Sequence, residues 1–258
     1  MPLLSTSSVV TALRAAGCVF AEDEAELILA TARTPDEAAA MVDRRVAGLP
    51  LELVLGWAEF AGLRITVEPG VFVPRRRTEF LVETALATVW GASVVVDLCC
   101  GSGAVGAALA ASLEAAELHA ADIDPTAVRC ARRNIAPHDG QAHEGDLFAA
   151  LPARLRGRVD ILAANVPYVP TGEVPLLPSE ARDHEPLVAL DGGRDGLDVL
   201  RRVAAEASEW LAPGGCLLVE TSERQAPLAL DTFHCSGLTA RTAVSEEMYA
   251  HVVLGTRP

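Results

Sequence analysis

The chain has 258 residues, of which 50% are hydrophobic and 4% aromatic, and its formal net charge is −14. This length favours one large α/β domain with a small appendage, and the apolar content excludes a disordered chain. All 21 basic residues are arginine, which excludes a Walker P-loop and a catalytic lysine, and the acidic surface disfavours nucleic acid as a partner.

The first predicted elements are helices. Helical periodicity runs from Ser5 to about Ala47, and residues 34–37, Thr-Pro-Asp-Glu, have the form of a helix N-cap. Residues 48–50 punctuate the chain, residues 59–70 alternate as in a β-hairpin, and residues 71–90 turn helical again. We therefore expect a helical N-terminal domain over residues 1–48, a linker with a β-hairpin over 49–77, and the main domain over 78–258.

From Gly91 onward, strand and helix patterns alternate. Alternation of this kind predicts βαβ units and a mostly parallel sheet covered by helices on both faces. The last two strands are separated only by a short turn, so this hairpin places an antiparallel strand in the sheet. The predicted strands are 92–98, 116–123, 158–165, 214–221, 238–245 and 248–256, and the predicted helices are 104–113, 125–134 and 197–211.

The first strand of this series ends at Asp97 and leads into a glycine-rich turn. Gly101, Gly103 and Gly106 match the pattern GxGxxG, which is weak alone but here follows a strand and opens a helix. The next strand ends at Asp122, where a carboxylate can accept both hydroxyls of a ribose. This context predicts a site for an adenosine-containing cofactor.

Ligands of open α/β sheets bind beyond the carboxyl ends of the strands, so Asp97, Asp122, Asp146 and Asn165 should converge on one crevice. NAD and S-adenosylmethionine both satisfy the glycine pattern. Asp97 favours S-adenosylmethionine, because a carboxylate holds its cationic ammonium and would repel a pyrophosphate. Methyl transfer is therefore the better interpretation.

The tetrapeptide Asn165-Val166-Pro167-Tyr168 follows an apolar strand at the mouth of the same crevice. Pro167 excludes Val166 from the helical region and leaves carbonyls free to face a ligand, and Asn165 adds a side-chain carbonyl. Two neighbouring acceptors suit a planar NH2 group, whose lone pair they would direct toward a sulfonium methyl. Tyr168 would cover the flat group and exclude water.

Several longer runs carry a family resemblance. They are VVDLCCGSGAVGAALA, ADIDPTAVRCARRN, EGDLF, AANVPY and GGRDGLDVLRRVAAEASEWLAPGGCLLVE, with LPLELVLGWAEFAGLRITVEPGVFVPRRRTE upstream. Together they resemble the protein-(glutamine-N(5)) methyltransferases, the group that modifies a glutamine in peptide release factors. The upstream run is similar to that family's linker hairpin and Pro-Arg-x-x-Thr-Glu element, and the resemblance extends from about Ala15 to the last strand.

The resemblance implies a class I S-adenosylmethionine-dependent methyltransferase domain, with a Rossmann-like, mostly parallel seven-stranded sheet that contains one antiparallel strand. It also implies that the helical N-terminal domain recognises a protein substrate. Asn165 and Tyr168 would be catalytic, and Asn165, Val166, Pro167 and Tyr168 would receive the substrate amide. The expected cofactor contacts are Asp97, Cys99, Cys100, Gly101, Ser102 and Gly103 around the methionine end, Asp122 at the ribose with Ile123 beside it, Asp146 and Leu147 at the adenine, and Asn165.

The sequence departs from the family pattern in three places. Val166 replaces a proline, so the pocket edge changes shape while the main-chain carbonyl remains. Cys99 replaces a glycine and adds a side chain close to the cofactor. Arg76 and Arg77 replace a proline and an acid, which creates the run Arg75–Arg77. We interpret this run as a solvated face, with an acidic partner or RNA as the alternative contact.

The six cysteines form no CxxC pair, and the histidines have no metal-like spacing, so we expect free thiols and no metal. The chain opens without a signal-peptide pattern and has no apolar run of the ~20 residues that a bilayer requires. We therefore expect a monomeric cytoplasmic protein with no membrane contact.

The leading hypothesis is methyl transfer to a glutamine of a protein, with a release factor as the candidate substrate. The alternative is an N(6)-adenine-type enzyme acting on RNA or DNA, because an exocyclic amine is also a flat NH2 group. That enzyme would need a basic cleft, for which only Arg75–Arg77 and Arg154–Arg158 are available. A cofactor-binding scaffold without catalysis is disfavoured by the retained site residues, and a nicotinamide dehydrogenase by the missing lysine.

Overall fold

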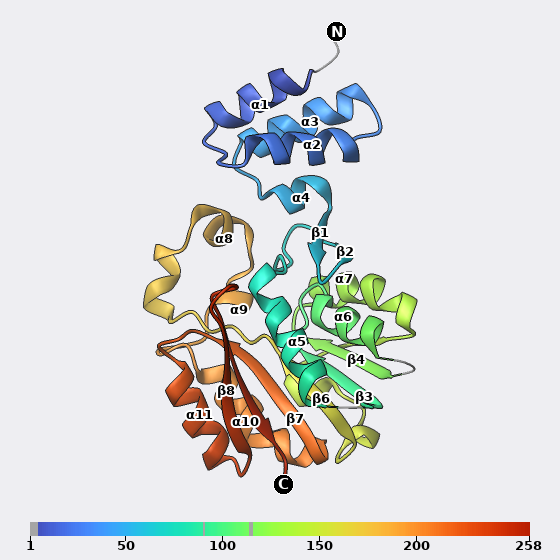
Figure 1. Cartoon of the computed structure of the whole chain (residues 1–258), viewed down its shortest axis with the longest axis vertical. Coiled ribbons are helices and arrows are strands. Elements are labelled where there is room, and N and C mark those ends of the chain that lie inside the picture. The colour runs from blue at the N-terminus through green and yellow to red at the C-terminus, as the bar shows by residue number, and fades with distance from the viewer. Residues whose placement is uncertain (1–4, 90, 114–115) are drawn as a thin grey trace.

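The computed structural model describes residues 5–89, 91–113 and 116–258. It shows a group of helices at the N-terminal end, a short hairpin, and a larger α/β body that holds the rest of the chain (Figure 1). Residues 1–4 of the expected N-terminal domain, and Trp90 at the end of an expected helix, lie outside the described residues. Within the described ranges, no helix combines the length and the apolar character that a membrane crossing requires.

The N-terminal helices pack around a small core of their own. Val9, Leu13 and Ile28 are fully buried in it. A cap forms at the start of the third helix, where Thr34 Oγ1 accepts a hydrogen bond from the Glu37 N–H at 3.1 Å. The helices are α1 Thr6–Ala15, α2 Ala21–Thr31, α3 Pro35–Val46 and α4 Leu51–Leu55.

The linker carries an antiparallel hairpin that leads into a helix on the sheet. Its two-residue loop, Ala61-Gly62, has positive φ at both positions, 48° and 73°, which is the geometry that suits a tight hairpin turn. Beyond the hairpin a short 3₁₀ helix precedes the first helix of the main body. These elements are β1 Trp57–Phe60, β2 Leu63–Thr66, η1 Arg76–Thr78 and α5 Glu79–Thr88.

The main body is built on a seven-stranded sheet in the order β5-β4-β3-β6-β7-β9-β8. β9 runs antiparallel to its neighbours β7 and β8, and the remaining neighbours pair in parallel. The expected mostly parallel sheet with one antiparallel strand is therefore confirmed. Its strands are β3 Val94–Leu98, β4 Glu117–Asp122, β5 Gln141–Glu144, β6 Val159–Ala164, β7 Leu211–Thr221, β8 Thr239–Ser245 and β9 Ala250–Thr256.

Both faces of the sheet are covered by helices. Val95 and Ile161 are fully buried in the core shared with α5, α6 and α7, while Val96 and Leu162 are buried in the core shared with α10 and α11. Successive side chains of a strand point to opposite faces, so burial on both sides explains the continuous apolar runs. The covering helices are α6 Ala104–Ser112, α7 Pro125–Ile135, α10 Asp198–Trp210 and α11 Ala226–Cys235.

Several parts of the fold differ from the sequence expectation. Residues 71–75, expected to be helical, precede the first helical turn at Arg76, and α11 was not predicted. β5 was not predicted, because it is a four-residue edge strand with polar residues and no fully buried side chain. β7 begins at Leu211, before the predicted start at residue 214. Residues 171–190, which we call the cover segment, fold into short helices. These are η5 Thr171–Leu176, α8 Ser179–His184 and α9 Leu187–Leu190. Outside this segment, the main body also contains the short 3₁₀ helices η2 Ala136–His138, η3 Leu147–Ala150 and η4 Ala153–Leu155.

Truncation of Leu162 tests the core of the sheet. Leu162 is fully buried in β6, so Leu162→Ala should lower the free energy of unfolding by about 2–5 kcal/mol through lost burial and a residual cavity. Urea denaturation followed by circular dichroism measures this change. Leu187→Ala is the matched control, because Leu187 is 59% exposed, and it should change the value by less than about 0.5 kcal/mol. Equal losses in the two variants would contradict the burial of β6.

Candidate functional site

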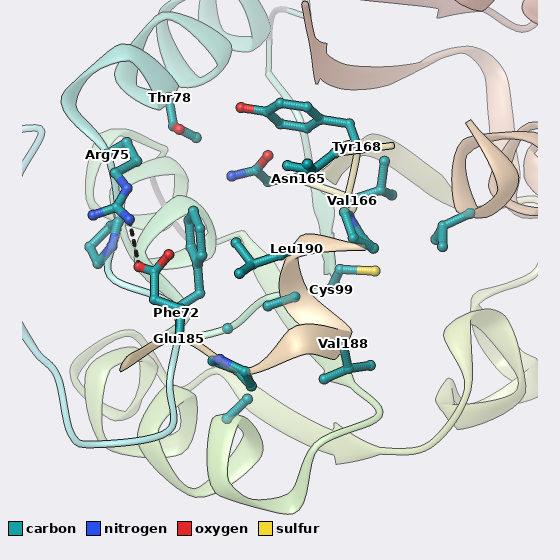
Figure 2. A pocket seen from close by; sticks show the side chains of 18 of the residues that line it. Phe72, Arg75, Thr78, Cys99, Asn165, Val166, Tyr168, Glu185, Val188 and Leu190 are labelled. Atoms are coloured by element: carbon teal, nitrogen blue, oxygen red, sulfur yellow. Dashed lines mark hydrogen bonds and ion pairs between the residues drawn. The ribbon is translucent and has the colours of Figure 1, made fainter. Parts of the chain in front are cut away.

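The carboxyl ends of β3, β4 and β6 open into one cavity of about 980 Å³, a size typical of small-molecule sites. Part of it is shown in Figure 2. Every expected site residue except Gly103 lines this cavity, which brings together Asp97, Cys99, Cys100, Gly101, Ser102, Asp122, Ile123, Asp146, Leu147, Asn165, Val166, Pro167 and Tyr168.

Two glycines of the turn permit close packing. Gly103 has φ 77°, and a Cβ there would lie 3.0 Å from the Cα of Ala131 in α7. A Cβ on Gly106 would lie 3.1 Å from Oδ2 of Asp97, the oxygen to which the Gly106 N–H donates at 2.8 Å. Gly103 thus allows α6 and α7 to approach each other; its contact with a cofactor stays a prediction.

Asp97 is a buried carboxyl group at the end of β3, 1% exposed. Desolvation raises the pKa of Asp97 to about 7, and the Gly106 N–H only partly opposes this rise. A cation beside the carboxyl would favour its ionised form. The cavity therefore contains an acid whose charge depends on what binds next to it.

The carboxylate of Asp122 is fixed by two backbone donors. Oδ2 accepts from the Gly101 N–H and Oδ1 from the Asp124 N–H, both at 2.9 Å. Burial raises the pKa of Asp122 against the effect of these bonds. A carboxylate oxygen can accept two hydrogen bonds, and each oxygen of Asp122 accepts one here, so Asp122 retains capacity for the hydroxyls of a ligand.

The cavity wall includes left-handed backbone at two residues other than glycine, Cys99 with φ 54° and Leu147 with φ 49°. Such values are sterically unfavourable for side chains with a Cβ. Burial raises the pKa of both Cys99 and Cys100, so their thiols stay protonated and are poor nucleophiles. Asp146, next to Leu147, is paired with Arg202 at 2.7 Å.

Asn165 and Val166 carry two hydrogen-bond acceptors that none of the described residues uses. Across the described ranges, no backbone or side-chain group donates to the Asn165 amide oxygen or to the Val166 carbonyl. Both residues line the cavity, and Asn165 is labelled in Figure 2. The following Pro167 keeps Val166 out of the helical region, so both oxygens stay available to a donor in the cavity.

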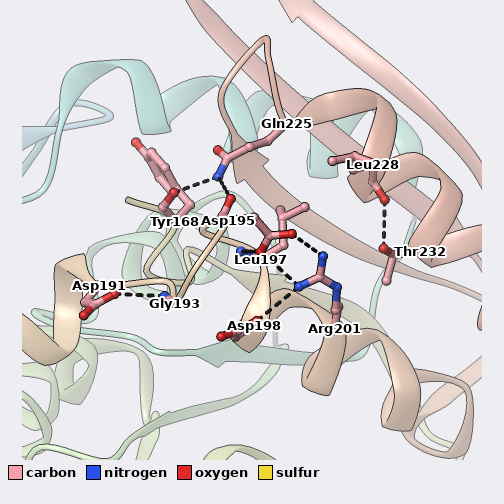
Figure 3. Close-up of polar contacts among 10 residues, drawn as sticks. All are labelled: Tyr168, Asp191, Gly193, Asp195, Leu197, Asp198, Arg201, Gln225, Leu228 and Thr232. Atoms are coloured by element: carbon pink, nitrogen blue, oxygen red, sulfur yellow. Dashed lines mark hydrogen bonds and ion pairs between the residues drawn. The ribbon is translucent and has the colours of Figure 1, made fainter. Parts of the chain in front are cut away.

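Tyr168 is held at both ends. Its hydroxyl donates to Glu220 Oε1 at 3.0 Å and accepts from a guanidinium N–H of Arg77. Its carbonyl accepts from Gln225 Nε2 at 2.9 Å, and the same amide donates to the Asp195 carbonyl at 2.9 Å, as Figure 3 shows. Burial raises the pKa of Tyr168, so its hydroxyl stays protonated.

The sequence analysis missed the cover segment as part of the site. Glu185 Oε1 accepts from Arg75 at 2.6 Å (Figure 2) and from the Val73 N–H at 3.2 Å, which ties the segment to the linker. The only local signal was Glu185-Pro186, which also reads as loop punctuation, because short helices give little periodicity. Its apolar cavity residues are Leu176, Leu177, Val188 and Leu190, and Phe72 joins them from the linker.

The arginine run is not simply a solvated face. Arg75 pairs with Glu185 at 2.6 Å, and Arg77 pairs with Glu220 at 3.0 Å. Arg76 is exposed. Two of the three positive charges are therefore directed to carboxylates of the same chain.

Comparison with known proteins identifies the family. A family model described as a methyltransferase small domain matches residues 62–175. A release factor glutamine methyltransferase from Geobacter sulfurreducens is 40% identical over 208 residues, covering 79% of this chain and 72% of the relative. The chain belongs to the release factor glutamine methyltransferase family. A second member, from Streptomyces coelicolor, is 41% identical and covers 72% of this chain and 67% of its own length.

Another relative of this chain is named for a different acceptor. The 4-amino-L-phenylalanine/4-methylamino-L-phenylalanine methyltransferase of Streptomyces pristinaespiralis is 36% identical over 203 residues, covering 76% of this chain and 69% of the relative. Similarity to the chain at this level thus includes proteins named for different nitrogen acceptors.

Solved structures share the fold. A methyltransferase from Pyrococcus furiosus aligns with a TM-score of 0.57 at 16% identity, covering 76% of this chain and 89% of that chain. The T. thermophilus 16S rRNA N2 G1207 methyltransferase, solved with AdoMet and guanosine, aligns with a TM-score of 0.55 at 23% identity, covering 78% and 50%. The class I, Rossmann-like fold is confirmed.

S-adenosylmethionine is the cofactor of this methyltransferase, and the cavity fits it. The buried carboxyl of Asp97 suits a cationic ammonium, and the unused acceptor capacity of Asp122 suits ribose hydroxyls. Ile123 and Leu147 add apolar surface near Asp122 and Asp146. These carboxylates and apolar side chains together suit a cationic ligand that contains adenosine.

The raised pKa of Asp97 predicts pH-dependent cofactor binding. With a pKa of about 7, Asp97 is increasingly protonated below neutrality and loses its attraction for the ammonium. The Kd of S-adenosylmethionine should therefore rise several-fold between about pH 7.5 and pH 6. Isothermal titration calorimetry measures this change, and Asp97→Asn should bind more weakly with little dependence on pH in this range. The same pH dependence in both proteins would refute this role.

The stability of the free protein should change in the opposite direction. The native state holds a proton that the unfolded chain releases, because the pKa of Asp97 rises from 3.8 to about 7 on folding. The contribution of Asp97 to the free energy of unfolding therefore falls as the pH rises from 3.8 to about 7. Denaturant titrations across this pH range measure the change. The free energy of unfolding of the wild type should fall relative to that of Asp97→Asn as the pH rises.

Proposed function

We propose that the chain transfers a methyl group from S-adenosylmethionine to the side-chain amide nitrogen of a glutamine in a peptide chain release factor. The observation that carries the proposal is the pair of unused acceptors at Asn165 and Val166, in the same cavity as Asp97 and Asp122. Family membership supports the substrate, because the relatives from two bacteria are named for it.

The bound cofactor supplies an electrophilic methyl group on a positively charged sulfur. The Asn165 side-chain oxygen and the Val166 carbonyl accept hydrogen bonds from the two N–H groups of the substrate amide and thereby fix the orientation of its NH2 group. The new nitrogen–carbon bond would form as the carbon–sulfur bond breaks, so the products are the N-methyl amide, S-adenosylhomocysteine and one proton, which the nitrogen releases to water. The lone pair of an amide nitrogen is delocalised, so the protein acts mainly by orientation and proximity. Tyr168 borders this site with a half-buried ring and helps to exclude water.

The N-terminal domain over residues 1–48 is proposed to recognise the protein substrate. Arg45 in α3 pairs with Glu24 at 2.6 Å and with Glu180 of the cover segment at 2.8 Å, so this domain contacts the segment that lines the cavity. Val19 and Phe20, between α1 and α2, are 82% and 68% exposed and offer apolar contact. We further propose that the protein acts as a monomer in the cytoplasm, where release factors act.

An aromatic amine of a free amino acid is the second candidate acceptor. A relative is named for 4-amino-L-phenylalanine, and an aromatic NH2 group is planar like an amide. The apolar side chains at the cavity, among them Phe72, Val188 and Leu190, suit an aromatic ring. The same two acceptors at Asn165 and Val166 would hold its nitrogen.

A nucleic-acid acceptor has less support from the charges. Arg75 and Arg77 are paired with glutamates at the cavity, and Arg154 and Arg158 both pair with Glu117 at 3.0 and 3.5 Å. Glu117 begins β4, at the end of the strand away from the cavity. These arginines therefore form no continuous basic surface at the site.

An acceptor panel tests the proposed function. The protein is incubated with labelled S-adenosylmethionine and, separately, with release factor, 4-amino-L-phenylalanine and total RNA. We expect label in the release factor, at one glutamine identified by mass spectrometry, and none in a variant with that glutamine changed to alanine. Label in RNA alone, or in the free amino acid alone, would contradict the glutamine assignment.

Replacement of Asn165 tests the acceptor pair. Asn165→Ala removes one of the two oxygens that orient the nitrogen, so kcat should fall by about 100-fold or more while the Kd of S-adenosylmethionine changes little. Val166→Ala is the matched control, because it trims the side chain and keeps the main-chain carbonyl, and it should retain most of the activity. Equal loss of cofactor binding and transfer in Asn165→Ala would place Asn165 in a different role.

A further inference from the structure

Tyr168 is held by residues that lie far from it in the sequence. Its hydroxyl contacts Arg77, from η1 in the linker, and Glu220, near the end of β7. Arg77 Nε donates to Glu220 Oε1 at 3.0 Å, the same oxygen that accepts the Tyr168 hydroxyl at 3.0 Å. These three side chains form one hydrogen-bonded group, which we call the Arg77 bridge.

Glu220 needs a cationic neighbour. It is 2% exposed, and its Oε2 is buried without a hydrogen-bond partner among the described residues. A buried carboxylate is strongly unfavourable when no opposite charge is near it. Arg77 supplies that charge while its own side chain remains 48% exposed at the edge of the cavity. The bridge therefore links a buried anion to a cavity residue.

The backbone of Tyr168 is fixed separately from its ring. Gln225 holds the Tyr168 carbonyl (Figure 3), and Gly196 passes so close that a Cβ there would lie 2.2 Å from that carbonyl oxygen. These contacts act on the carbonyl of Tyr168 and do not involve its ring. The hydroxyl at the far end of the ring bonds to Arg77 and Glu220, and the guanidinium also lies 5.8 Å from the ring centroid.

We propose that Arg77 is a positioning residue for methyl transfer, which acts through Tyr168. By bonding the hydroxyl and Glu220 together, it fixes the ring that borders the substrate nitrogen held by Asn165. This inference rests on the proposed function. The planar guanidinium donates to two oxygens at once, which the single ammonium of a lysine reproduces poorly.

Steady-state kinetics test this role, with the acceptor that the wild-type protein methylates in the panel as the substrate. Arg77→Met should lower kcat by about 100-fold, because a small misplacement at a reacting centre is enough for such a loss. The Kd of S-adenosylmethionine, measured by calorimetry, should be unchanged. Arg77→Lys should recover part of kcat. Arg76→Met is the matched control at an exposed neighbour and should show wild-type kinetics.

A double-mutant cycle separates positioning from a general structural effect. In a Tyr168→Phe background the ring has no hydroxyl for Arg77 to hold, so the further change Arg77→Met should cost far less than in wild type. Independent, multiplicative losses from the two changes would overturn the proposal, because Arg77 would then act by another route.

A further variant removes the buried charge. Arg77→Met alone leaves Glu220 without a countercharge, whereas Arg77→Met combined with Glu220→Gln also removes the buried charge and should therefore keep the wild-type melting temperature. A low kcat with a wild-type melting temperature in this double variant supports positioning. Wild-type kcat in it, or in Arg77→Met, overturns the inference. A wild-type protein that methylates no acceptor in the panel refutes the proposed function instead, so the two failures are distinct.

Discussion

The site depends on the register of three parallel strands. Leu98 in β3 is level with Ala121 in β4 and with Ala164 in β6. The next residues along the chain, Cys99, Asp122 and Asn165, therefore lie at one edge of the sheet, although the three are far apart in the sequence. A shift of one strand by a single residue would turn these side chains toward the opposite face. The sheet core fixes the register, and the register assembles the site.

Charge is distributed unevenly around the cavity. The side that fits the cofactor holds Asp97 and Asp122, neither of which pairs with an arginine, so it suits a cationic ligand. The side with the acceptors has its charges neutralised, because Arg75 and Arg77 contact Glu185 and Glu220. A positively charged donor and a neutral amide thus find matching surroundings in one cavity, despite the acidic character of the whole chain.

Local sequence patterns predicted the parts of the structure that depend on local chemistry. The apolar strands, the hairpin at Ala61-Gly62, and the convergence of Asp97, Asp122 and Asn165 all follow from residue type and from the rule that ligands bind at strand ends. The edge strand β5 was missed because its residues are polar. The contact of Arg77 with Glu220 has no local signal, since it joins side chains 143 positions apart. Domain roles and cofactor contacts of single residues stay predictions.

The side-chain ion pairs around the cavity draw every cation from a guanidinium, as at Arg75, Arg77 and Arg202. A guanidinium keeps its proton throughout the range in which proteins are folded. Alkaline conditions therefore leave these contacts intact, and acid weakens them only through their carboxylate partners. Acetyltransferases that modify lysine have no target side chain here, and amine-reactive labels would leave all of these contacts untouched.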